Sequence, residues 1–179
     1  MNGSSESFHL QADTQDAGVA LLRTTGIHGS VFPCENGWVT LLPRDDTGSG
    51  GQILARMSSG VLLHLLISED RGWMFELYRD GMPASSYLCR LSDTIVVDDR
   101  RLNSEAIVEL VVRRGMDRDG ARLEVERILR PNPDDGTWNG HGFDPGHRFA
   151  DLLQLPNLAW TARPLSAEDA SSLGAANVG

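Results

Sequence analysis

The apolar run from Val61 to Ile67 constrains the fold more than any other stretch of the chain. Alternate residues of a strand point to opposite faces of a sheet, and both faces of this run are apolar apart from His64. We therefore expect a central strand that is covered on both faces. Two alternating segments follow, at 73–78 and 85–91, and Asp80-Gly81 between them is a tight-turn dipeptide. Together the three segments predict an antiparallel meander.

The segments before this run predict the rest of the sheet. In chain order they are a strand, an amphipathic helix, a hairpin around Asn36-Gly37 and a second helix, at 8–12, 14–24, 30–42 and 52–59. With the run itself they give the βαββαβ order of a ferredoxin-like unit, and the hairpin after it adds two strands. The prediction is an α+β fold with helices packed on an antiparallel sheet of about five to six strands.

The C-terminal third is predicted to be mainly helical. Apolar residues at helical spacing indicate three further helices, at 104–114, 121–129 and 145–155, and a last strand is expected at 158–162. We expect one α+β domain over residues 1–165, with a flexible end at 1–6 and the helical part at 104–163 as its extension. The small polar residues at 166–179 predict a disordered tail.

Composition narrows the function classes. The chain has 179 residues, of which 40% are apolar, as in globular domains. Its formal net charge of −9 argues against nucleic acid and anionic membranes as partners, since both attract basic surfaces. All sixteen positively charged residues are arginine, which excludes lysine Schiff bases and the Walker A lysine.

The same composition indicates the compartment. The N-terminus lacks the basic and apolar regions of a signal peptide, and no apolar run approaches the roughly 18 residues of a membrane span. Cys34 and Cys89 are too few for a disulfide framework. We therefore expect a cytoplasmic protein without a membrane anchor, and the sequence indicates no cofactor.

Three stretches are similar to a known group of proteins. They are GWVTLLP at 37–43, the hairpin at 62–81 that ends in ELYRDG, and RFADLLQLPNLAW at 148–160. Together they resemble a group of bacterial proteins that share a GWV strand and an LYRDG hairpin and have no assigned activity. The resemblance spans about residues 30–163. It implies an α+β fold and no particular function.

The predicted site residues lie in and just after the long polar loop at 131–146. His141, Asp144 and His147 lie within seven residues, and imidazole and carboxylate groups can share a divalent metal. The alternative is that Asp144 caps a helix and the two histidines are solvated. Trp138 lies in the same loop, where no core periodicity explains it, and with Asp134 and Asp135 it forms the predicted partner-binding site.

Two further pairings concern the strands. His64 and Glu76 lie on segments that can pair, so they are either a proton-transfer pair or a hydrogen-bonded pair on a partly covered sheet face. Cys34 is a candidate nucleophile only if a histidine lies close to it. The alternative is a small, buried side chain.

The preferred hypothesis is a non-catalytic protein-binding protein, either an adaptor or an immunity-type inhibitor of a basic partner. It rests on the acidic charge and the Trp138 loop, and a structure without a cleft of perturbed titratable groups would favour it. One alternative is a metal-assisted hydrolase that uses His141, Asp144 and His147. The other is a small-molecule sensor or structural subunit with a pocket against the sheet.

Overall fold

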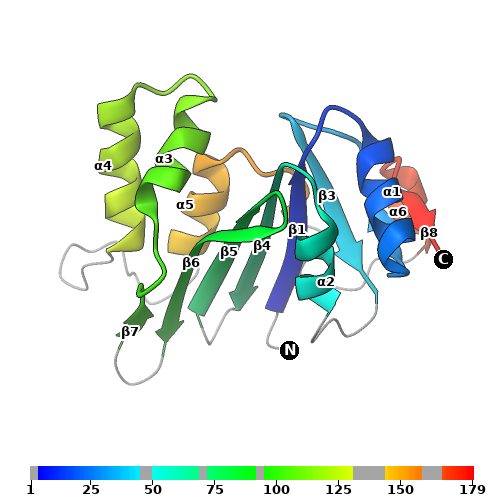
Figure 1. The fold of residues 1–179 in the computed structure, drawn as a ribbon, viewed down its shortest axis with the longest axis horizontal. Helices are drawn as coiled ribbons and strands as arrows, with labels where there is room; N and C mark the ends of the chain where they lie inside the picture. Colours follow the sequence, from blue (N-terminus) through cyan, green and yellow to red (C-terminus); the bar gives the residue numbers. More distant parts are fainter. Residues whose placement is uncertain (1–3, 45–49, 69–71, 92–94, 131–143, 159–166) are drawn as a thin grey trace.

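An antiparallel sheet extends through the computed structural model from one side to the other (Figure 1). The structure describes residues 4–44, 50–68, 72–91, 95–130, 144–158 and 167–179. Within them it has eight strands: β1 Ser4–Gln11, β2 Gly29–Val31, β3 Trp38–Pro43, β4 Val61–Ser68, β5 Gly72–Arg79, β6 Met82–Leu91, β7 Ile95–Asp98 and β8 Ala176–Val178. It also has six helices: α1 Gln15–Thr25, α2 Gly50–Met57, α3 Ser104–Val112, α4 Arg118–Leu129, α5 Asp144–Leu152 and α6 Ala167–Ser172.

The strand order is β7-β6-β5-β4-β1-β3-β2-β8, and the recorded pairings are antiparallel. The α+β class and the antiparallel sheet are therefore confirmed. The first six elements follow the predicted strand-helix-strand-strand-helix-strand order. Strands β4, β5 and β6 are adjacent and form the predicted meander.

Both predicted tight turns are present, and their backbone angles explain the residues chosen there. Asn36 and Gly37 have φ angles of 51° and 72°, and Asp80 and Gly81 have φ angles of 47° and 78°. Two consecutive positive φ angles match the right-handed twist of a hairpin and favour Asn-Gly and Asp-Gly sequences. The turn sequences thus set the pairing next to each turn, Glu35 with Trp38 and Arg79 with Met82, and a β-bulge at Leu77 and Tyr78 shifts the register of β5 and β6 beyond it.

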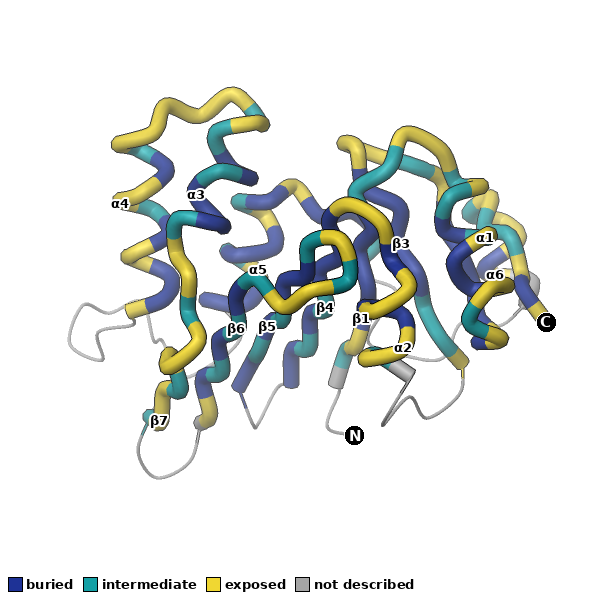
Figure 2. The backbone as a smooth tube through the Cα atoms, in the orientation of Figure 1, coloured by how far each residue is buried: buried dark blue, intermediate teal, exposed yellow. Residues whose placement is uncertain are grey.

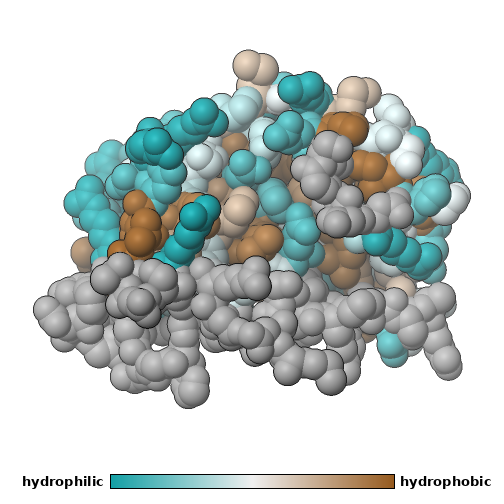
Figure 3. Space-filling view, turned by 90° about the horizontal axis from the view of Figure 1, so that it is seen from below, coloured by the Kyte–Doolittle hydropathy of each residue, from teal (hydrophilic) through white to brown (hydrophobic). Residues whose placement is uncertain are grey.

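The predicted number of strands was wrong, because the sheet has eight strands rather than five or six. The missed strands, β7 and β8, are four and three residues long and lie at the two edges. Short edge strands depend on pairing with a neighbour rather than on their own apolar pattern. Val96 and Val97 of β7 are 50% and 38% exposed. Figure 3 shows the molecule from below, and hydrophobic residues also lie there on the left, the side on which Figure 1 shows β7.

The C-terminal segment differs from the disordered tail that its composition predicted. Residues 167–172 form α6, and β8 pairs with β2 through the partners Ser30 and Asn177. The Ser30 hydroxyl also donates a hydrogen bond to the Asn177 side chain, at 3.1 Å. Val178 is buried in the core beneath α1. These contacts with distant residues stabilise a segment whose own composition is weakly structured. Most of the strand expected at 158–162 lies outside the described residues.

The helices cover opposite faces at opposite ends of the sheet. Helices α1 and α2 pack on one face over a core that draws on β1, β2, β3 and β8. Gly18 permits the close approach of α1, because a Cβ atom there would lie 2.7 Å from the Leu41 and Val39 side chains. Helices α3, α4 and α5 pack on the other face over β4, β5 and β6. None of the helices in the described part of the chain is long and apolar enough to cross a membrane.

Among the residues that the structure describes, this offset leaves part of one sheet face without a helix over it. Along β4, β5 and β6, buried residues alternate with half-buried ones (Figure 2). The half-buried residues point to the side of α2, beyond the end of that helix, and we call them the open face: His64, Leu66, Met74, Glu76, Ser86 and Leu88. The expectation that β4 is covered on both faces was therefore wrong at His64 and Leu66, which are half-buried, whereas Leu62 and Ser68 on the same face are buried. Helix α2 reaches Leu62 but no helix in the described residues covers Leu66.

Candidate functional site

Strand register arranges the open face in two cross-strand rows. One row runs from Phe8 through His64 and Glu76 to Ser86, and each residue is paired with the next across neighbouring strands. The next row is Glu6, Leu66, Met74, Leu88 and Asp98. Side chains paired across strands lie about 5 Å apart, so each row is continuous. A polar row therefore lies beside an apolar row that has a carboxylate at each end.

His64 connects the first strand to the meander. Its Nε2 lies 2.9 Å from Glu6 Oε1, and its Nδ1 lies 3.4 Å from Glu76 Oε2. The ring also stacks on Phe8, with 4.4 Å between ring centroids. Burial lowers the pKa of His64, but the hydrogen bonds and charges of the two glutamates outweigh this effect and raise the pKa above 6.5. The two glutamates therefore favour the charged form of the imidazole.

Glu76 is the centre of the polar row. It accepts a hydrogen bond from the Tyr78 hydroxyl at 2.9 Å in addition to its contact with His64. The hydrogen bond from His64 is the largest cause of a lowered pKa for Glu76, and the charge of Arg101 adds to it. Burial and the carboxylate of Glu76 raise the pKa of Tyr78. A charged carboxylate is thus held by two donors at a surface that solvent can reach.

Two cavities adjoin Glu76. The smaller has a volume of about 500 Å³ and extends toward Leu88, Asp98 and Arg100. The larger has a volume of about 770 Å³, within the usual range for small-molecule sites, and lies between α2 and the β5–β6 hairpin. Glu76, Ser86 and Arg101 line both cavities. The open face is therefore a hollow with perturbed titratable groups in its wall, a feature enriched at functional sites.

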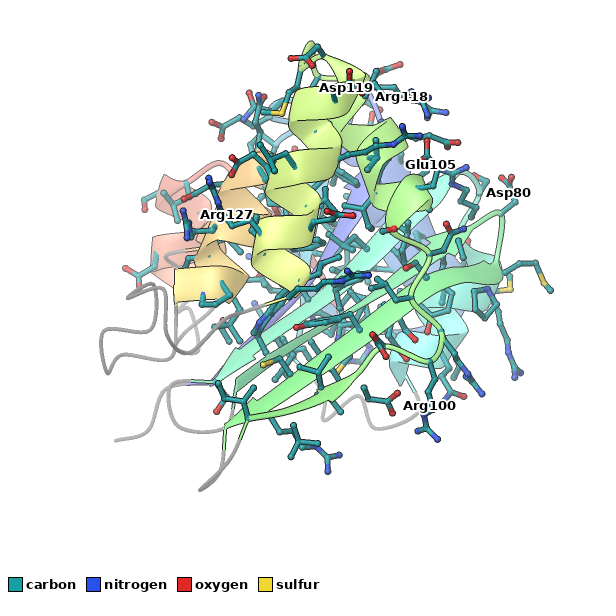
Figure 4. The ribbon with its side chains drawn as sticks, turned by 90° about the vertical axis from the view of Figure 1, so that its left-hand side faces the viewer. Asp80, Arg100, Glu105, Arg118, Asp119 and Arg127 are labelled. Carbon is teal, nitrogen blue, oxygen red and sulfur yellow. The ribbon has the colours of Figure 1, made fainter. Side chains whose placement is uncertain are left out.

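The arginines around these cavities differ in their partners. Arg100 is bound to Asp98 through two nitrogens, at 2.6 and 2.9 Å. Figure 4 shows Arg100 on the side of the sheet away from α3 and α4. Arg56 and Arg101 line the larger cavity, and neither makes an ion pair with a residue that the structure describes. These two guanidinium groups have donor capacity for a ligand.

A second histidine lies on the covered face and has no access to solvent. His9 is fully buried, with its Nε2 3.0 Å from Ser7 Oγ and its Nδ1 3.3 Å from Thr40 Oγ1. Burial is the main cause of a pKa lowered to about 3, and the charge of His64 contributes. A serine beside a neutral histidine resembles an activated nucleophile. Ser7 and Thr40 are themselves buried, however, so this group is a hydrogen-bond network of the core.

The residues predicted from the 131–146 loop are mostly outside the described part of the chain. Trp138, Asp134, Asp135 and His141 all lie there, as does the side chain of Asp144, which begins α5. His147 is exposed on α5. Among the described residues, no three His, Cys, Asp or Glu side chains are placed to hold a metal ion. The partner-binding and metal sites of this loop therefore stay predictions.

Cys34 lies between β2 and β3 and Cys89 lies on β6, and neither has a catalytic partner in the described residues. The Cys34 thiol donates a hydrogen bond to the Ala12 carbonyl at 3.1 Å, and Cys89 is buried. Burial raises the pKa of the Cys89 thiol and so disfavours its nucleophilic form.

His64 and Glu76 were predicted from the sequence, whereas Glu6, Tyr78, Arg56 and Arg101 were missed. The alternation Glu76-Leu77-Tyr78 was the available signal for Tyr78, because residues two apart share a sheet face. The arginines carried no such signal, since they join the open face through packing between distant segments.

Comparisons of the chain with protein-family models, with curated proteins and with solved structures find no match. The site must therefore be interpreted from its own geometry.

Proposed function

We propose that this chain is a non-catalytic binding protein whose ligand site is the larger cavity against the open face. The observation that carries this proposal is the cavity of about 770 Å³ beside a hydrogen-bonded Glu76. Binding sites are typically concave and mainly apolar, with a few oriented polar groups. Here Met82 and Pro83 supply apolar wall, and Tyr78 and Ser86 supply hydroxyl groups. This is the small-molecule sensor among the functions considered from sequence.

A second candidate is the adaptor or immunity-type inhibitor of a basic protein. The net charge of −9 favours it, because complementary charge accelerates protein association. The cleft of perturbed groups at Glu76 counts against it as the whole account of the molecule, since a simple docking surface needs no such cavity. Its predicted contacts, Trp138, Asp134 and Asp135, remain candidates on the other loop. The metal-assisted hydrolase gains no support from the described residues.

A variant that blocks the cavity distinguishes a small-molecule ligand from a protein partner. The protein would be purified from its native cell under mild conditions and denatured, and the released small molecules measured by mass spectrometry. Ser86→Trp should fill the space that both cavities share, so the compound found with the wild type should be missing from this variant. Val96→Trp is the matched control, because Val96 is exposed and lines neither cavity.

The same purification tests the second candidate. At low salt, a basic protein retained by the wild type and by Ser86→Trp but lost with Trp138→Ala would favour the protein partner. If Ser86→Trp and Val96→Trp release the same compounds as the wild type, the cavity is not the ligand site and the first proposal is wrong. Circular dichroism and thermal unfolding would verify that each variant is folded.

A further inference from the structure

We propose that the larger cavity binds a small acid, with its carboxylate or phosphate held by Arg56 and Arg101 and a hydroxyl or amino group held by Glu76. This inference rests on the proposed function and adds the chemical class of the ligand. Guanidinium groups are planar, permanently charged donors that bind oxyanions through paired hydrogen bonds. Two of them in one cavity wall, without an ion pair in the described residues, therefore favour an oxyanion.

Backbone contacts fix the position of the main chain at both arginines. The Arg101 carbonyl accepts a hydrogen bond from the Ser86 backbone N–H at 3.1 Å, so Arg101 lies beside β6. The Arg56 carbonyl lies against Gly81, where a Cβ atom would come within 2.8 Å of it. Gly81 and Ser86 are five residues apart on one strand and its turn, which corresponds to at most about 17 Å. Two arginine side chains that extend toward each other from these anchors can reach a common ligand.

The carboxylates of the cavity are already engaged, which leaves the arginine charge available. Glu76 is held by His64 and Tyr78, and Asp80 Oδ1 accepts a hydrogen bond from the Gly60 N–H at 2.8 Å. Glu76 lies near enough to Arg101 for that charge to lower its pKa. A carboxylate there repels a bare anion but accepts a hydrogen bond from a ligand hydroxyl or amine. The geometry therefore favours an acid that also carries a donor group.

Four probes test this chemistry on the full chain by NMR titration of backbone amides. They are inorganic phosphate, succinate, malate, which is succinate with one hydroxyl, and the neutral succinamide. Malate should bind more tightly than succinate, and succinamide should not bind. Separate titrations with phosphate and with malate show whether the site accepts a phosphate, a carboxylate or both. Shifts should concentrate at residues 81–86 and 99–101.

Substitutions then assign the binding to named residues. Arg56→Gln and Arg101→Gln should each weaken malate binding about tenfold, the typical effect of losing one charge-assisted hydrogen bond. Arg127→Gln is the matched control, because it removes the same charge from α4, on the other side of the sheet (Figure 4). Glu76→Ala should remove the preference for malate over succinate.

The outcomes separate this inference from the proposed function. If Arg127→Gln weakens malate binding as much as Arg101→Gln, or if Glu76→Ala keeps the preference for malate, the assignment is wrong. If none of the oxyanions binds, but Ser86→Trp still abolishes capture of a neutral compound, the cavity is a ligand site and only its acid specificity is refuted. If no probe binds and no compound is captured, both proposals fail.

Discussion

The two faces of the β4–β6 meander are built from the same three strands but have different chemistry. Residues on the covered face form an aromatic cluster under α5, in which Trp73, Phe75, Tyr87 and Phe149 contact one another with ring centroids 4.6 to 6.1 Å apart. Those on the open face are half-buried, and His64 and Glu76 among them are hydrogen-bonded to each other. The alternation within each strand therefore places the aromatic core on one face of the sheet and the half-buried residues on the other.

The same division explains why two histidines of one sheet have opposite pKa shifts. His9 lies on the covered face among hydroxyl groups, where burial lowers its pKa to about 3. His64 lies on the open face between two glutamates, which raise its pKa. Desolvation disfavours the imidazolium at both positions, but only His64 has carboxylates to offset it. Access to charged partners, which differs between the two faces, therefore decides the direction of each pKa shift.

The largest expected difference between the faces concerns packing. Phe75→Ala should lower the free energy of unfolding by about 3–5 kcal/mol, because it leaves a cavity beside Phe149, whose ring stacks on Phe75 at 4.6 Å. Met74→Ala, one residue away on the open face, should cost about 1 kcal/mol or less, since its side chain is half-buried. Urea unfolding of both variants measures the contrast. Equal losses would show that the open face is covered in solution.

The second prediction concerns His9 and acid. In the unfolded chain His9 takes up a proton near pH 6.5, whereas in the fold it does so only near pH 3. Stability should therefore fall as the pH drops below 6.5, with a slope approaching about 1.4 kcal/mol per pH unit from this residue. His9→Gln keeps a polar side chain without the titration, so its unfolding free energy should depend less on pH between 6.5 and 4. An unchanged slope would mean that another group controls acid unfolding.

The covered face was the part of the fold that the sequence predicted best. The alternation in Trp73, Phe75 and Leu77 identifies a buried strand face, and the dipeptide Asp80-Gly81 identifies its turn, because both signals are local. Strands β7 and β8 carry no such signal, since edge pairing with β6 and β2 stabilises them. Local pattern thus predicts the middle of the sheet and misses its edges.

The open face was predictable only in part, for a related reason. Counting across the hairpin indicated that His64 and Glu76 could pair, and the register confirms that they are direct partners. Arg56 comes from α2 and Arg101 from the segment after β7, about 45 residues apart in the sequence. Their meeting depends on how α2 and the hairpin pack together, through the contact of Arg56 with Gly81. No periodicity within either segment contains that information.

The smallest expected effect tests the histidine of the open face. Protonated His64 is stabilised by Glu6 and Glu76, so its contribution to stability is present below pH 6.5 and is lost as the pH rises through its raised folded-state pKa. His64→Gln should therefore cost about 1 kcal/mol more at pH 6 than at pH 9, a typical value for a hydrogen-bonded ion pair near solvent. Comparing the two pH values cancels the lost stacking on Phe8, which does not titrate. As the pH falls, the stability lost on His64→Gln should grow, because protonated His64 is stabilised by its two glutamates. The stability lost on His9→Gln should shrink as the pH falls, because neutral His9 destabilises the wild type at acidic pH. The two losses should therefore change with pH in opposite directions. If the two losses change with pH in the same direction, the contrast between the two faces does not extend to their histidines.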